Sequence, residues 1–413
     1  MTDSESARMA RIVSGLPTAA LDLLRETDWD SLRHAYGSAR DIPVSLCFLL
    51  DDDPKVRSSA LGALDMGVLH QGSLYSVTAP AALFVAAILD HPLGVTEHEG
   101  HVPWDDGSPR GLRASLLAWL GRVAESAAYG EDPGRSRLCW DWEPWHDALP
   151  DDRGPDDFAA LHACRAIRPA LYDAIEPSLS SPDPHVREAA LGAAVQLLRA
   201  PGLADRIPRA AALVRARVGD GSGRRQGDGS GRRQGDEKGR RERAVAAWAL
   251  GQWRCDVSDL LVDPDPAVRV CAALGPDPAD RPRALAVLLD ALRDPETTDG
   301  WFPEPLPGLD GWFRFTVLRH ALALAASFEE VAPVAVALVA GFRPSVVDYE
   351  RGPLLLLAFP GGYDPAHPLT PAQRDLLRAF VDTEGAAAGI TQNVVWFRAA
   401  GLPESPEEVA ALL

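Results

Sequence analysis

The chain has 413 residues, of which 46% are apolar, so it can form two or three compact domains or one extended repeat array, and it is not a disordered chain. Its formal charge of −18 at pH 7 disfavours a protein that coats nucleic acid or binds an anionic membrane, because both partners attract clustered positive charge. The five cysteines form no Cys-x-x-Cys pair, so neither a disulfide framework nor a cysteine-based zinc site is expected.

Helical patterns alternate with proline and glycine turn signals along the whole chain, and no alternating run indicates a strand. In residues 1–150 they predict helices near 5–14, 18–25, 29–37, 42–50, 54–69, 79–90 and 110–129. In residues 151–293 they predict helices near 155–178, 184–199, 203–217, 240–253, 256–262, 266–274 and 281–293. In residues 294–413 they predict helices near 314–327, 329–341, 345–358, 371–383, 389–400 and 406–412. The expected fold class is therefore all-α.

One short motif, Asp-Pro-x-Val-Arg, occurs at Asp53, Asp183 and Asp265, each time before a run of small and apolar residues. Asp183 follows Asp53 by 130 residues and Asp265 follows Asp183 by 82, close to three and two units of about 40 residues. The aspartate suits a helix N-cap, the proline suits the first helical position, and the small residues allow close helix packing. We expect the arginine to be structural, pairing with an aspartate between successive units.

This motif resembles that of the HEAT-repeat family, in which the second helix of each pair carries it. The resemblance implies stacked antiparallel helix pairs, an armadillo-like α-solenoid (an α-α superhelix) with a curved surface, and usually a macromolecular partner. We therefore expect a single HEAT-like solenoid over residues 1–413, with the three parts given above. A duplicated Gly-Asp-Gly-Ser-Gly-Arg-Arg-Gln sequence inside the middle part predicts a flexible low-complexity loop at 218–240.

Three long connections interleave tryptophan with carboxylates, and we name them the first (91–106), second (139–152) and third (299–313) Trp segments. Tryptophan faces attract guanidinium or ammonium groups, and carboxylates give them charge-assisted hydrogen bonds, so the segments could form an acidic, aromatic rim along one edge of the array. The candidate partner-binding residues are Trp104, Asp105, Asp106, Trp140, Asp141, Trp142, Glu143, Trp145, Asp147, Trp301 and Trp312. The alternative is that the tryptophans pin their segments to the scaffold, which is favoured for Trp301 and Trp312 and stays open for the second segment.

Glu97, His98 and His101 are close together in the first Trp segment and have side chains that bind divalent metals. The spacing departs from the helix-borne His-Glu-x-x-His pattern, because only two residues separate the histidines and a glycine precedes the second. A solvated polar turn is therefore favoured over a metal site. No P-loop, dinucleotide fingerprint or Gly-x-Ser-x-Gly elbow occurs, so the sequence predicts no cofactor.

These patterns favour a non-catalytic scaffold that binds a protein with a basic surface through the rim, for example as an inhibitor or an immunity-like protein. The alternative is an enzyme with its active site in the concave groove, either a metal-dependent hydrolase or lyase or a HEAT-like DNA glycosylase. A purely structural role for the Trp segments is a third hypothesis. No signal-peptide pattern and no stretch of roughly 20 apolar residues occurs, so we expect a cytoplasmic protein without a membrane partner.

Overall fold

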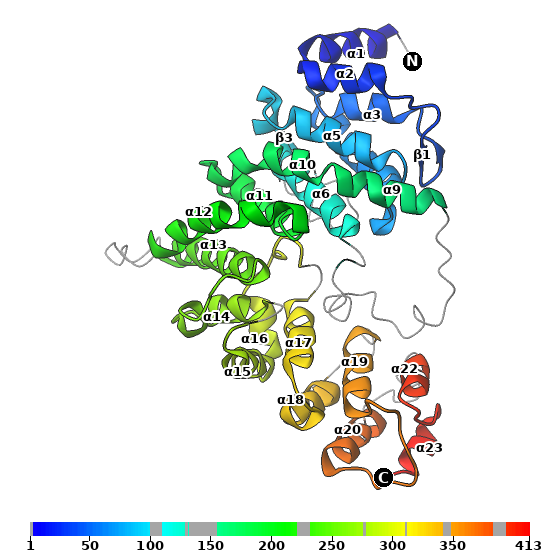
Figure 1. Ribbon diagram of the computed structural model, residues 1–413, viewed down its shortest axis with the longest axis vertical. Helices are drawn as coiled ribbons and strands as arrows, with labels where there is room; N and C mark the ends of the chain where they lie inside the picture. The colour runs from blue at the N-terminus through cyan, green and yellow to red at the C-terminus, as the bar shows by residue number, and fades with distance from the viewer. Residues whose placement is uncertain are drawn as a thin grey trace. The chain divides into compact units, whose positions relative to one another are not determined.

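The computed structural model describes residues 3–99, 110–128, 131, 155–220, 232–275, 278–309, 312–341, 348–382 and 394–413. These residues form two compact units, the first containing those up to 220 and the second those from 232 onward. Both units are mostly helical, and the strands within these ranges form two short antiparallel pairs (Figure 1). The prediction of an all-α fold is therefore confirmed. No helix in the described ranges is long and apolar enough to cross a membrane.

The helices of the first unit are α1 (Asp3–Gly15), α2 (Thr18–Glu26), α3 (Ile42–Phe48), α4 (Pro54–Ala63), α5 (Thr78–Ile88), α6 (Leu112–Ala127), α9 (Pro155–Ala166), α10 (Arg168–Ile175), α11 (Pro184–Leu197) and α12 (Ile207–Asp220). A π-helical turn spans Leu64–Val68, and 3₁₀ turns span His70–Gly72, Pro92–Val95, Glu176–Ser180 and Pro201–Arg206. Strand β1 (Arg33–His34) pairs with β2 (Gly37–Ser38), and β3 (Glu97–His98) pairs with β4 (Arg110–Gly111).

The helices of the second unit are α13 (Arg232–Gln252), α14 (Pro266–Ala273), α15 (Arg281–Leu292), α16 (Pro295–Gly300), α17 (Phe313–Leu324), α18 (Phe328–Gly341), α19 (Asp348–Ala358), α20 (Pro371–Asp382), α22 (Val394–Ala399) and α23 (Pro406–Ala410). A 3₁₀ turn at Leu260–Val262 precedes α14.

Small residues let neighbouring helices approach closely, as the motif predicts. Helix α6 packs along α11 in the first unit, and α13 packs along α14 in the second (Figure 1). A β-carbon at Gly121 of α6 would lie 3.1 Å from the Cα of Ala193 in α11. One at Gly251 of α13 would lie 3.3 Å from the carbonyl oxygen of Ala272 in α14. Both distances are tighter than most β-carbon contacts, so a side chain at either glycine would require the neighbouring backbone to shift by a few tenths of an ångström.

Tryptophan contributes strongly to the two cores. The buried tryptophans of the described ranges are Trp29, Trp119, Trp248, Trp253 and Trp396. Packing rather than a surface role therefore explains five of the 11 tryptophans of the chain.

Four predicted helices differ in the structure. The predicted helix at 256–262 is only a 3₁₀ turn at Leu260–Val262. The other three differ for local reasons. Residues 29–37 contain the β1–β2 hairpin instead, because Gly37 has a φ of +133°, which a helix does not allow. The predicted helix at 155–178 is broken at Ile167, since Pro169 lies in the first turn of α10 and cannot continue α9. The predicted helix at 54–69 changes to a π-helical turn after Ala63.

Helices occupy both ends of the segment 218–240 that the sequence predicts as a flexible loop. Helix α12 reaches Asp220 and α13 begins at Arg232, so only residues 221–231 of this segment lie outside the described ranges. The arginine, glutamine, glutamate and lysine that follow Arg232 are good helix formers, which outweighed the two glycines among them.

Candidate functional site

The three Asp-Pro-x-Val-Arg motifs build the same local structure, which we call the capping turn (51–54, 181–184 and 263–266). Asp53, Asp183 and Asp265 have extended backbones and cap α4, α11 and α14, with proline at the start of each helix. Each carboxylate accepts a hydrogen bond from the N–H two residues later, at 2.9 Å from Lys55, 2.9 Å from His185 and 3.0 Å from Ala267. The predicted N-caps are therefore confirmed.

A second acceptor lies two residues before each capping aspartate. The Asp51 carboxylate accepts from the Asp53 N–H at 2.9 Å, and the Asp263 carboxylate accepts from the Asp265 N–H at 2.8 Å. In the middle copy the Ser181 hydroxyl accepts from the Asp183 N–H at 3.2 Å. The structural motif thus begins two residues before the repeated Asp-Pro-x-Val-Arg sequence. The residue at this first position is Asp or Ser, and its side chain closes an Asx-turn or an ST-turn.

The motif arginine is held by its own capping turn. Arg187 donates to the carbonyls of Ser181 and Pro182, both at 2.8 Å. Arg269 donates in the same way to the carbonyls of Asp263 at 2.8 Å and Pro264 at 3.2 Å.

Arg57 repeats this arrangement in the first copy, at 2.7 Å from the Asp51 carbonyl and 3.0 Å from the Asp52 carbonyl. The expected structural role is present, but the partners are backbone carbonyls rather than an aspartate of the next unit. The arginine follows the capping aspartate by four residues, one helical turn, so its side chain can reach back across the helix start.

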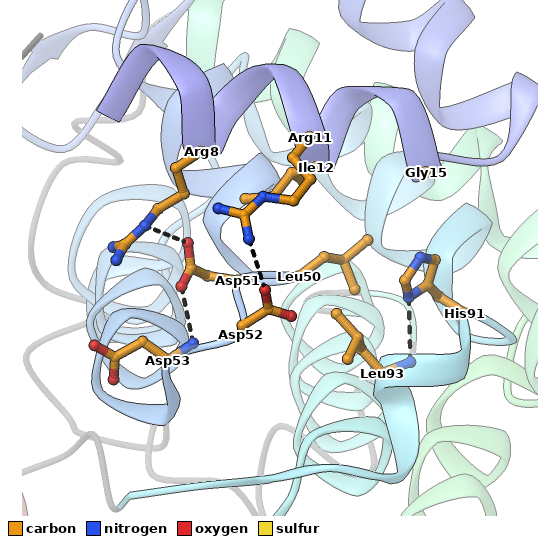
Figure 2. A pocket seen from close by; sticks show the side chains of 10 residues that line it. All are labelled: Arg8, Arg11, Ile12, Gly15, Leu50, Asp51, Asp52, Asp53, His91 and Leu93. Carbon is orange, nitrogen blue, oxygen red and sulfur yellow. Dashed lines mark hydrogen bonds and ion pairs between the residues drawn. The ribbon is translucent and has the colours of Figure 1, made fainter. Parts of the chain in front are cut away.

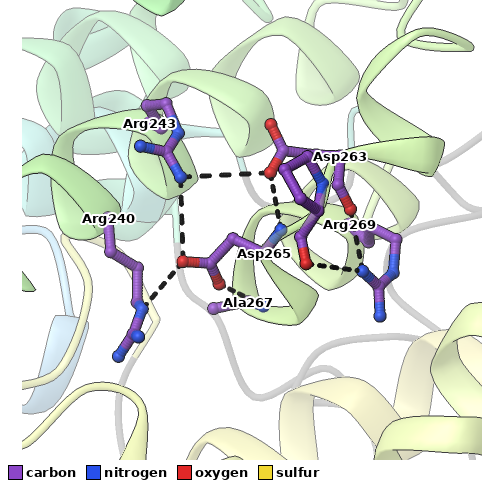
Figure 3. Close-up of polar contacts among 7 residues, drawn as sticks. Arg240, Arg243, Asp263, Asp265, Ala267 and Arg269 are labelled. Carbon is purple, nitrogen blue, oxygen red and sulfur yellow. Dashed lines mark hydrogen bonds and ion pairs between the residues drawn. The ribbon is translucent and has the colours of Figure 1, made fainter. Parts of the chain in front are cut away.

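The aspartates of two capping turns pair instead with arginines of an earlier helix. In Figure 3, Arg240 of α13 lies 2.9 Å from the Asp265 carboxylate, and Arg243 lies 3.7 Å from it and 3.9 Å from Asp263. In the first unit, Arg8 and Arg11 of α1 pair with Asp51 at 3.4 Å and with Asp52 at 3.3 Å, so there the second pair is made by the residue before the capping aspartate. In both cases the two arginines are three residues apart and therefore share a helix face.

A hollow of about 420 Å³ lies beside the first capping turn (Figure 2). Its lining residues come from α1, from the capping turn with the residue before it, and from the start of the 3₁₀ turn: Arg8, Arg11, Ile12, Gly15, Leu50, Asp51, Asp52, Asp53, His91 and Leu93. This volume lies within the usual range of small-molecule sites.

Glu97 and His98, two of the three residues of the predicted metal cluster, lie on opposite sides of strand β3. Glu97 is exposed on β3 while His98 is 1% exposed, because successive strand residues face opposite sides. The His98 imidazole lies 2.7 Å from the Ser115 hydroxyl through Nε2, and its Nδ1 lies against the Glu99 carbonyl. His101 is outside the described ranges, and within them no group of three His, Cys, Asp or Glu side chains is arranged to hold a metal ion.

The third Trp segment holds an arginine of the same chain. Trp312 is 52% exposed, and the guanidinium of Arg314 lies 4.5 Å from the centroid of its ring. The other side of the contact is Asp299, whose carboxylate lies 3.4 Å from the Arg314 guanidinium and accepts from the Arg314 N–H at 2.9 Å. Burial raises the pKa of Asp299, and the bonds from Arg314 offset part of that rise.

Trp301 lies on the inner side of the same segment. It is partly buried, and its ring packs edge-on against Phe313 at 6.4 Å between centroids. Arg241 of α13 also fastens the segment by donating to the carbonyls of Glu304 at 2.6 Å and Pro305 at 2.8 Å. These contacts favour the anchoring interpretation for Trp301.

The other candidate partner-binding residues, Trp104, Asp105, Asp106, Trp140, Asp141, Trp142, Glu143, Trp145 and Asp147, lie outside the described residues. Their role stays a prediction from the sequence. Comparison with family models, with curated proteins and with solved structures finds no match to this chain.

Proposed function

We propose that the chain is a non-catalytic, HEAT-like repeat scaffold that binds a basic protein partner through its Trp segments. In this proposal the helical units stack into an α-solenoid, and the first and second Trp segments form the binding rim. The net charge of −18 supports a cationic partner, because it raises the rate at which such a partner is encountered.

The repeated-unit part of the proposal is supported by the three capping turns. Each has the same carboxylate cap, the same proline and the same pair of arginine-to-carbonyl bonds. A repeat array needs a local structure of this kind, which recurs without depending on its surroundings.

The observation that carries the binding part is the arginine held in the third Trp segment. Trp312 stacks on the Arg314 guanidinium while Asp299 pairs with it from the side. These are the two contacts that an acidic, aromatic rim would offer an arginine of a partner. Since Arg314 already occupies this site, the proposal assigns Trp301 and Trp312 to bracing the fold.

The partner contacts then fall to the first and second Trp segments. The proposed contact residues are Trp104, Asp105, Asp106, Trp140, Asp141, Trp142, Glu143, Trp145 and Asp147. Tryptophan is the residue type most often found at binding hot spots, so substitutions of Trp140, Trp142 and Trp145 should have the largest effect.

The test is affinity purification from the native host, with partners identified and quantified by mass spectrometry. Wild type is compared with a folded Trp140→Ala, Trp142→Ala, Trp145→Ala variant and with Trp312→Ala as the matched control. We expect a stoichiometric basic protein with wild type and Trp312→Ala, and its loss with the triple variant.

Equal capture by all three proteins would contradict the assignment to the second Trp segment. Failure of every form to capture a partner, together with stoichiometric metal in the purified protein, would favour the enzyme hypothesis instead. In that case substituting His98 and His101 should release the metal.

A further inference from the structure

The hydroxyl of Ser115 in α6 is bonded to an imidazole rather than to its own helix. A serine inside a helix can donate to the carbonyl one turn earlier, as Ser59 of α4 does to Lys55 at 3.0 Å. The Ser115 hydroxyl instead lies 2.7 Å from Nε2 of His98, and no other hydrogen bond of this hydroxyl is recorded within the described ranges. His98 belongs to β3, so tertiary packing brings the two side chains together.

The tautomer of His98 makes its Nε2 the acceptor of this hydrogen bond. Its Nδ1 lies against the backbone carbonyl of Glu99, and a carbonyl oxygen only accepts, so Nδ1 carries the proton. In the neutral ring Nε2 then has a free lone pair, and the Ser115 hydroxyl donates to it. A nucleophile bonded to a general base, with a third group that orients the base, has this arrangement.

Strand β3 is fastened from both sides, which fixes the position of the imidazole. The Ser58 hydroxyl of α4 donates to the Glu99 carbonyl at 2.9 Å, and Arg57 of the same helix donates to the Glu97 carbonyl. On the other side β3 pairs with β4, which leads directly into α6 and Ser115. The base and the nucleophile are therefore held on connected elements, and proton transfer depends on such a fixed geometry.

Burial gives the two residues different roles. His98 is 1% exposed, so bulk water does not compete for its Nε2, whereas Ser115 keeps part of its surface exposed. A nucleophile must be reached by its substrate, while its base needs to reach only the nucleophile. Gly111 precedes α6 and offers no side-chain cap, so the start of the helix one turn from Ser115 also favours a developing negative charge.

We propose that Ser115, activated by His98, is a covalent acylation site for a small activated acyl donor such as an aryl ester or a thioester. The Oγ attacks the acyl carbon, its proton passes to Nε2 of His98, and the departing aryl oxide or thiolate takes that proton. The products are an ester at Ser115 and a free phenol or thiol, so no oxidant or cofactor is needed. This stoichiometric modification is compatible with a scaffold and does not depend on the proposed protein partner.

The test incubates the full chain with p-nitrophenyl acetate and follows the release of p-nitrophenolate, while peptide mass spectrometry locates the acetyl group. Ser115→Ala removes the nucleophile. His98→Gln keeps a hydrogen-bond acceptor and removes the base. The matched control is Ser59→Ala, which removes a helical serine whose hydroxyl is bonded to its own backbone.

We expect one acetyl group on Ser115 in wild type and in Ser59→Ala, and loss of the matching release of p-nitrophenolate in Ser115→Ala. His98→Gln should be acetylated at Ser115 at least roughly 100-fold more slowly, which is the usual contribution of a general base. Circular dichroism melts verify that each variant is folded, and Ser115→Ala carries the test if His98→Gln is not.

Acetyl groups confined to Lys55, Lys238 or the amino terminus of wild type would overturn the proposal. So would equal release of p-nitrophenolate by wild type and Ser115→Ala. A folded His98→Gln variant that is acetylated at Ser115 as fast as wild type would show that the imidazole does not activate the hydroxyl.

Discussion

Asp265 makes two kinds of contact at the start of α14, and they can be separated by substitution. Its carboxylate caps the helix at Ala267 and also pairs with Arg240 and Arg243 of α13. Asp183 has the same cap, whereas among the described residues no ion pair to its carboxylate is recorded. The two positions therefore compare a cap alone with a cap that also joins two helices.

We predict that Asp183→Ala lowers the free energy of unfolding by about 1 kcal/mol, the usual cost of a lost N-cap. Asp265→Ala should cost more, because it also leaves two partly buried arginines without this partner. Asp265→Asn should fall between wild type and Asp265→Ala, since the amide oxygen can still cap. Urea unfolding followed by circular dichroism measures the order, and equal losses at the two sites would contradict it.

The buried thiols give a pH dependence of defined sign. Burial raises the pKa of Cys164 to about 12, although Arg168 lowers it in part, and the unfolded thiol titrates near 9. Above pH 9 the unfolded chain therefore loses this proton before the folded chain does, so the thiol's contribution to stability falls as the pH rises.

We predict that the stability of wild type relative to Cys164→Ala falls by about 2.5 kcal/mol between pH 8 and pH 11. Urea unfolding of both proteins at several pH values measures this difference. Other groups titrate equally in the two proteins and cancel. A difference that does not change with pH would show that the folded thiol ionises normally.

The sequence predicts the contacts of a single residue best when its partners are close in the chain. The caps at Asp53, Asp183 and Asp265 could be predicted, because capping depends on neighbours within three residues. The pairing of Asp265 with Arg240 could not, because it joins residues 25 apart whose proximity is created by packing. For the same reason no pattern in the sequence indicates that Asp51 and His91 line one hollow.

At the scale of elements, glycine sets the distance between packed helices. Gly121 is close to Ala193 across the α6–α11 crossing, whereas a β-carbon at Gly239 of α13 would meet nothing within 4 Å. The same substitution should therefore have opposite effects at two glycines that both lie inside helices.

We predict that Gly121→Leu lowers the free energy of unfolding by about 1–3 kcal/mol or more, because the added atoms force α6 and α11 apart. Gly239→Leu should be neutral or stabilising by up to about 1 kcal/mol, since leucine is the better helix former. Thermal and urea unfolding of the two variants and of wild type measure these changes in the free energy of unfolding. Similar destabilisation by both would show that helix spacing is not set at Gly121.

Most helices could be predicted from apolar periodicity, and α5, α11, α15, α18 and α20 begin within two residues of the expected positions. The failures occurred where a local conformation overrides periodicity. Gly37 with its positive φ turns the chain into a hairpin, and Pro169 divides what the pattern suggests is one helix. The short helix α16 was missed because its sequence, Pro-Glu-Thr-Thr-Asp-Gly, is polar and has no apolar stripe.

At the scale of the whole molecule, the acidic composition should affect the rate at which the chain associates with a charged partner. With a charge of −18, association with a basic partner should be accelerated at low ionic strength and slowed by salt. We predict that raising sodium chloride from about 50 to about 300 mM lowers the association rate constant roughly tenfold or more while changing the dissociation rate far less. Surface plasmon resonance with the identified partner measures both rates, and a salt-independent association rate would contradict the proposed charge attraction.

The capping turn also bears on how such a chain can change over generations. Its aspartate with the N–H that it caps, and its arginine with the two carbonyls that accept from it, lie within seven residues, as in Asp263 to Arg269. A gene duplication that copies one unit therefore copies donors and acceptors together, and the new helix start is complete without compensating changes elsewhere. If the capping turns mark repeated units, as proposed above, such units could be gained or lost one at a time, and arrays of different length could arise from one ancestral unit.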